Sequence, residues 1–116
     1  MKSVFSVFCM CLFSWSALGA GSYQNKAFID GNELLKVCEI NDRGACQSYI
    51  VGVTDGMLYF FGDNLDKSKT ICLPSNVSGS QITDVTIKHV KDHPVSRNLN
   101  AAQLIFTAIL LAFPCI

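Results

Sequence analysis

Apolar residues recur at three- and four-residue steps in several stretches of the chain, the spacing that is typical of amphipathic helices. We expect a first short helix within residues 27–39, where Asp30 and Glu33 have the spacing of a capping box. After a turn over residues 41–44, a second helix is expected over residues 45–61, with Thr54 outside its apolar face. Two glycines of this stretch, Gly52 and Gly56, lie four residues apart, and close helix packing is the favoured explanation for them.

Two more helices are expected in the second half of the chain. The third begins after Ser78 or Ser80 and stops before Pro94; its β-branched residues also fit a strand, but the spacing of its apolar positions favours a helix. The fourth covers residues 101–113 after a cap at Asn98 or Asn100, and it is apolar on every side. Such a helix is best buried at the centre of a bundle or partly against a second subunit. The expected fold class is therefore all-α, a small bundle of about four main helices.

The first 20 residues have the composition of a secretory signal peptide. Lys2 precedes an apolar run that ends in small residues, and cleavage after Gly19 or after Ala20 fits equally well. Cys9 and Cys11 lie inside the run without the small residues that precede a lipid-modified cysteine, so we expect them to leave with the signal. We therefore expect residues 1–20 to be removed and residues 21–116 to form one domain in the periplasm.

Four cysteines remain in the processed chain, and an even number in a small exported protein indicates two disulfides. Three pairings are possible. We favour Cys38 with Cys46, which bracket a short turn, and Cys72 with Cys115, which would fix the end of the chain. Since a domain of this size buries a modest core, such crosslinks would matter for its stability.

The charge of the processed chain excludes strong electrostatic attraction to nucleic acid or to anionic lipid. Loss of Lys2 leaves eight basic residues against nine acidic ones, and we therefore expect neither nucleic acid nor membrane as a partner.

Candidate chemistry along the chain is sparse, and we expect neither an enzyme nor a bound cofactor. His89 and His93 have a spacing that can hold a metal, but the glutamate of a metalloprotease motif is missing, and an ordinary helix-end pair without metal is favoured. A cysteine nucleophile would need a free thiol, which two disulfides would not leave.

Taken in order, four motifs resemble the Rap/Tai family of type VI secretion immunity proteins, which protect bacteria against peptidoglycan-cleaving amidases delivered by neighbours. The motifs are FIDGNELLKVCE at 28–39, CQSYIVGVTDG at 46–56, ICLPSNVSGSQITDVTIKHVKDHP at 71–94 and NLNAAQLIFTAILLAFPC at 98–115. The resemblance implies an all-helical fold with disulfides, a periplasmic location and a homodimer. Ser48 stands where a glycine is expected before the tyrosine, a difference that a helix surface tolerates.

The resemblance implies that the protein binds a cysteine-histidine peptidoglycan amidase and occludes its catalytic cleft. From polarity and expected exposure, we place the contact surface in two segments that present polar loops to a groove. These are the loop residues Asp63, Asn64, Asp66, Lys67 and Lys69, and a second patch of Asp92, His93 and Arg97. The alternative function is a small helical carrier or chaperone that binds apolar ligands or unfolded clients, which the very hydrophobic fourth stretch would suit.

Overall fold

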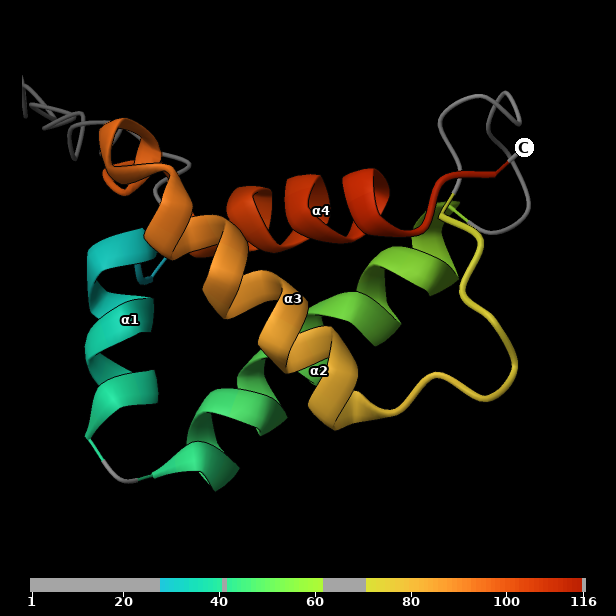
Figure 1. The fold of residues 1–116 in the computed structure, drawn as a ribbon, viewed down its shortest axis with the longest axis horizontal. Helices are drawn as coiled ribbons and strands as arrows, with labels where there is room; N and C mark the ends of the chain where they lie inside the picture. The colour runs from blue at the N-terminus through green and yellow to red at the C-terminus, as the bar shows by residue number, and fades with distance from the viewer. Residues whose placement is uncertain (1–27, 41, 62–70, 116) are drawn as a thin grey trace, which may run out of the picture.

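The computed structural model describes residues 28–40, 42–61 and 71–115, and these residues form four α-helices (Figure 1). The expected signal peptide, residues 1–20, lies outside them. The helices are α1 (Gly31–Glu39), α2 (Arg43–Phe61), α3 (Gly79–Asp92) and α4 (Ala101–Ala112), and a short 3-10 turn η2 (Pro94–Ser96) follows α3. In the described residues, β-type pairing is limited to two isolated bridges, Asp30 with Asn100 and Ile71 with Pro114. The all-α prediction is confirmed.

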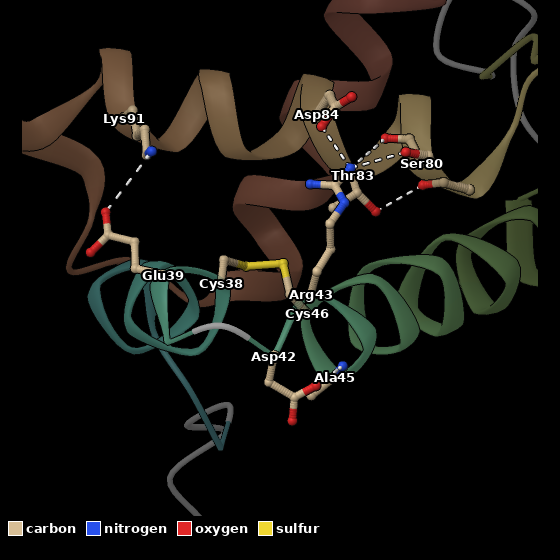
Figure 2. The surroundings of a disulfide bond; sticks show 11 residues. Cys38, Glu39, Asp42, Arg43, Ala45, Cys46, Ser80, Thr83, Asp84 and Lys91 are labelled. Carbon is tan, nitrogen blue, oxygen red and sulfur yellow. Dashed lines mark hydrogen bonds and ion pairs between the residues drawn. A yellow bond between two sulfur atoms is a disulfide. The ribbon is translucent and has the colours of Figure 1, made fainter.

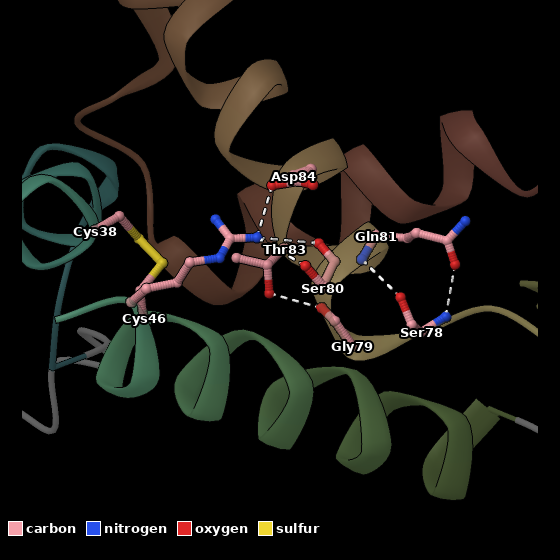
Figure 3. A network of polar contacts seen from close by, with 9 residues as sticks. Cys38, Cys46, Ser78, Gly79, Ser80, Gln81, Thr83 and Asp84 are labelled. Carbon is pink, nitrogen blue, oxygen red and sulfur yellow. Dashed lines mark hydrogen bonds and ion pairs between the residues drawn. A yellow bond between two sulfur atoms is a disulfide. The ribbon is translucent and has the colours of Figure 1, made fainter. Parts of the chain in front are cut away.

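Polar side chains start α1 and α3 by the same device. The Asp30 carboxylate accepts a hydrogen bond from the backbone N–H of Glu33, whose own carboxylate accepts one from the N–H of Asp30. Ser78 and Gln81 make the equivalent reciprocal pair at α3 (Figure 3). Each box satisfies two backbone donors that a helix start leaves without partners. Ser78, rather than Ser80, is therefore the cap of α3.

The hydrophobic core is built around α4, and α3 packs against both α4 and α2 (Figure 1). One side of α4 is fully buried, through Ala101, Leu104, Ile105, Ala108 and Ile109. The opposite side is open in places, since Leu111 keeps 67% of its surface exposed. The expectation of a buried final helix is thus correct for one side of α4.

Two disulfides join segments of the fold, with the pairing that the sequence favoured. The Cys38–Cys46 bond links the end of α1 to the start of α2, across the turn between them (Figure 2). The Cys72–Cys115 bond joins the segment before α3 to the residues after α4, and it closes a loop of 43 residues in sequence. In the chain-entropy model, a closure of that length reduces the entropy of the unfolded chain by an amount worth about 4 kcal/mol.

The buried face of α2 differs from the expected one. Thr54, which we placed outside the apolar face, is 1% exposed and lies in line with buried Cys46 and Ile50. Its hydroxyl donates a 2.7 Å hydrogen bond to the carbonyl of Ile50, so its burial leaves no polar atom unsatisfied. Phe60, by contrast, is 73% exposed. Apolar residues occupy most sides of α2, and their spacing alone therefore does not identify the face that packs.

The packing explanation for Gly52 and Gly56 is wrong. A Cβ atom built at either position meets no heavy atom within 4 Å, which means that none of the other helices in the described residues approaches them. Both glycines lie within α2 and retain the conformational cost of glycine in a helix.

We predict that Gly52→Ala and Gly56→Ala each raise the free energy of unfolding by about 0.5–1 kcal/mol, because alanine is the better helix former and has room here. Chemical denaturation of the oxidised protein would measure the change. A loss of stability in both variants would show that something in the folded protein does occupy this face.

Gly31 is the glycine that packing does require. At the start of α1, an added Cβ would lie 2.5 Å from the Leu104 side chain and 2.9 Å from the Arg97 carbonyl oxygen. Two backbone hydrogen bonds form here, from the N–H of Gly31 to the carbonyl oxygen of Leu99 and from the N–H of Asn32 to that of Arg97. The start of α1 is therefore pressed against the connection that leads into α4.

We predict that Gly31→Ala lowers the free energy of unfolding by about 1–3 kcal/mol, the usual cost of overpacking, because the backbone of Arg97 cannot move aside cheaply. Gly52→Ala is the matched control, being the same substitution in open space. Equal stability changes in the two variants, measured by denaturation, would contradict the close packing of Gly31.

Candidate functional site

The first expected contact segment falls between two ends that the fold holds firmly. Its residues, Asp63, Asn64, Asp66, Lys67 and Lys69, lie outside the described residues. Before it, the ring of Phe61 lies 5.7 Å from that of Phe106 on α4. After it, Ile71 is buried and bridges Pro114, and the N–H of Cys72 donates to the carbonyl of Phe113. Both flanks of the segment are therefore attached to α4 and to the residues that follow it.

The second expected patch is assembled at the C-terminal end of α3, but Arg97 has a structural task there. Its Nε donates a 2.9 Å hydrogen bond to the carbonyl of Val90, and its Nη2 donates one of 2.6 Å to that of Lys91. These carbonyls belong to the last turn of α3, where helix geometry provides no partner for them. A guanidinium there also complements the negative end of the helix dipole. Arg97 is half-buried as a result.

Asp92 and His93 lie beside Arg97 and are exposed. Asp92 pairs with Lys88, 2.6 Å away, and this hydrogen bond lowers the pKa of the Asp92 carboxyl. The Nδ1 atom of His93 lies 2.7 Å from the carbonyl oxygen of His89, one helical turn earlier. The patch thus presents a carboxylate and an imidazole to solvent, and each is held in place by a neighbour on α3.

A shallow groove of about 320 Å³ runs between the C-terminal halves of α3 and α4. Its charged and polar side is made by Lys88, His89, Asp92 and His93, and its apolar side is completed by Val85, Ala108, Leu111 and Ala112. The groove therefore extends the second patch onto the exposed side of α4.

A second polar cluster joins α2 to α3, and it was not predicted from the sequence. The Arg43 side chain donates to the Asp84 carboxylate at 2.8 Å and to the Ser80 hydroxyl at 3.0 Å (Figure 2). Both ion-pair partners are more than half exposed, so the pair contributes little to stability. A hollow of about 310 Å³ lies beside it on α2, lined by Arg43, Gly44, Gln47, Ser48 and Val51. Contacts between residues some 40 positions apart depend on how α2 and α3 pack, and sequence spacing does not report that.

Groups of three or more metal-ligating side chains are not found in the described residues. Within those same residues, none of the helices combines the length and the apolar character needed to cross a membrane.

We predict that Arg97→Ala lowers the free energy of unfolding by about 1–3 kcal/mol, because two carbonyls at the end of α3 lose their charged donor. Arg97→Lys should recover part of the loss, since an ammonium keeps the charge but lacks the fork that reaches both oxygens. Lys91→Ala, which removes an exposed charge nearby, is the control and should change stability by less than about 0.5 kcal/mol. Denaturation curves in which Arg97→Ala behaves like the control would refute the capping role.

Comparison with protein families gives one clear result. The model of the family described as Rap1a immunity proteins matches residues 30–115, about three-quarters of the chain. Searches of curated proteins and of solved structures returned no match. The matched region begins at the capping residue of α1 and ends at the cysteine that closes the second disulfide, so it contains all four helices. The chain therefore belongs to the Rap1a family of immunity proteins.

Proposed function

We propose that this protein is a periplasmic immunity protein that binds a type VI secreted peptidoglycan amidase and occludes its active-site cleft. The family match over residues 30–115 carries the proposal. An immunity protein works by binding, and it needs no chemistry of its own, no cofactor and no catalytic residue. The specific target, a cysteine-histidine amidase, follows from the motifs that resemble the Rap/Tai proteins.

The periplasmic location is supported by the two disulfides and by the composition of residues 1–20. Cys38–Cys46 and Cys72–Cys115 bonds persist in an oxidising compartment, whereas cytosolic thiols are kept reduced. The amidase would act in the same compartment, because peptidoglycan lies there.

Occlusion requires a rigid scaffold that presents polar groups to a cleft, because ordering a flexible segment upon binding costs affinity. The proposed contact residues of segment 63–69 lie between flanks that are fastened to α4. Asp92 and His93 extend the proposed surface at the end of α3, and Arg97 would act there chiefly by holding that end in place. A fastened scaffold of this kind loses less conformational entropy when the partner docks.

The decisive experiment is calorimetric titration of the processed, oxidised protein with the amidase encoded beside it, followed by a peptidoglycan cleavage assay at the same ratios. We expect tight binding at a fixed stoichiometry and loss of cleavage at that ratio. Binding without loss of cleavage would reject occlusion of the active site but would still identify the amidase as a binding partner. Absence of binding would reject this amidase as the target.

We predict that Asp63→Ala and Asp66→Ala each weaken binding of the amidase about tenfold or more, because charged side chains at a protein interface are matched by the partner. Asp55→Ala, which removes an exposed carboxylate from α2, is the matched control and should leave affinity unchanged. Arg97→Lys belongs in the same titration series, with its stability measured alongside. Changes within about 0.5 kcal/mol in all the contact variants would show that the effector is bound elsewhere.

We also propose that the protein forms a homodimer in the periplasm. Several large apolar side chains are exposed in the described residues, Leu111 on α4 and Tyr59 and Phe60 on α2 among them. A second subunit that covered such side chains would remove apolar surface from water. Analytical ultracentrifugation of the processed protein gives the test, and a monomer at all concentrations would reject the dimer.

The carrier hypothesis finds less support. The two hollows described on the surface, beside Arg43 and between α3 and α4, are shallow and carry charged side chains, whereas a carrier needs an apolar chamber. Binding of a hydrophobic dye or lipid retained through purification would favour the carrier nonetheless.

A further inference from the structure

The two imidazoles of the chain form a pair at the end of α3. His89 and His93 are the only histidines in the sequence, and the centres of their rings lie 4.2 Å apart with the ring planes inclined by 30°. His89 is half-buried and His93 exposed, and both line the groove between α3 and α4. The pair is thus accessible from solvent along one edge.

The hydrogen bond of the His93 ring determines which of its two nitrogen atoms has a lone pair available to bind a metal. The partner of Nδ1 is the backbone carbonyl oxygen of His89, at 2.7 Å, and a carbonyl oxygen only accepts. Nδ1 must therefore carry the proton and donate it. In the neutral ring, Nε2 then has an unprotonated lone pair. Metal-ligating histidines commonly have this arrangement, since a carbonyl that receives one ring N–H orients the other nitrogen toward the metal.

His89 lies one helical turn before His93 and is half-buried on the same groove. A neutral imidazole is the form that binds metals. The Asp92 carboxylate lies on the same groove and supplies negative charge near an incoming cation, although it is paired with Lys88.

We propose that His89 and His93 form a two-imidazole chelate site for one late first-row divalent transition ion, such as Cu²⁺ or Zn²⁺, bound through Nε2 of His93 and one ring nitrogen of His89. Nitrogen ligands of this type favour these ions over Mg²⁺, and Cu²⁺ binds more tightly than Zn²⁺ at a given site. Water completes the coordination, which makes the site exchangeable rather than structural. The proposal replaces the metal-free pair that the sequence favoured. It does not depend on the immunity function, although His93 and Asp92 also belong to the proposed contact surface.

The bound ion would stabilise the end of α3. His93 is the residue at which α3 ends, and its backbone is no longer helical there. A chelate would tie His93 to His89 in the last turn. Because the ion binds the folded chain preferentially, it should raise the thermal midpoint.

The test uses the processed protein without a histidine tag, with Zn²⁺ and Mg²⁺ as probes and the two imidazoles followed by NMR. We expect saturable shifts in the ring signals of both histidines with Zn²⁺, no shifts with Mg²⁺, and a higher thermal midpoint with Zn²⁺. Electron paramagnetic resonance with one equivalent of Cu²⁺ should show two imidazole nitrogens. Zn²⁺ that leaves either ring unperturbed would overturn the proposal in the wild-type protein, before any variant is made.

Substitutions then assign the site. The double variant His89→Gln, His93→Gln should lose saturable Zn²⁺ binding, with its fold checked by circular dichroism. Lys88→Gln is the matched control, because it alters the same groove and keeps both imidazoles, and it should retain binding. Binding that survives in the double variant would place the ion elsewhere, for example on the chain's terminal amine, and would overturn the proposal.

Discussion

The fold depends on the burial of α4 with both of its ends fastened to distant parts of the chain. At its start, the N–H of Ala101 donates to the carbonyl of Ile29, and Asn100 bridges Asp30. At its end, the carbonyl of Phe113 accepts from Cys72, and a disulfide follows two residues later. Apolar burial alone is non-directional and would allow α4 to slide or rotate in the core. The fastenings at the two ends remove that freedom.

The same constraint explains why α1 can be short. α1 has nine residues, too few to be stable alone, but it is capped by Asp30, pressed against the α3–α4 connection through Gly31 and linked to α2 by a disulfide. The last two of these contacts join α1 to elements that pack against α4. Stability is therefore distributed over local caps and long-range fastenings, in addition to a core that is small because the domain is small.

Much of this fold could be predicted because its signals are local. Capping boxes extend over four residues, as at Asp30 and Ser78, and a proline marks the end of α3, so element positions were predicted to within a few residues. The disulfide pairing followed from which cysteines flank a turn and which lies at the chain end. What could not be predicted depends on packing. Thr54 is polar but buried, and Gly52 is small but in open space. Only the positions of α3 and α4 decide these two outcomes.

The candidate site was predicted less completely, for a related reason. Polarity identified Asp92, His93 and Arg97 as residues that share one end of a helix, and the structure does bring them together. Polarity does not distinguish a side chain that binds a partner protein from one that caps a helix of its own chain. Arg97 is of the second kind, since it donates to two carbonyls of α3. Segment 63–69 remains a prediction from sequence, since it lies outside the described residues.

A binding protein of this size has few residues that serve only recognition. The end of α3 combines a helix cap, an ion pair and an imidazole pair within ten residues, from Lys88 to Arg97, and the exposed atoms of these groups are the ones that a partner could meet. Because the cap holds the surface in place, a substitution there changes both the stability of the fold and the shape that is presented. Affinity and stability must therefore be measured on the same variants, and a conservative replacement such as Arg97→Lys is more informative than truncation to alanine. Arginine provides both a positive charge and a planar set of hydrogen-bond donors. Arg97→Lys removes only the donor geometry, whereas Arg97→Ala removes the charge as well, so a comparison of the two variants separates the two contributions.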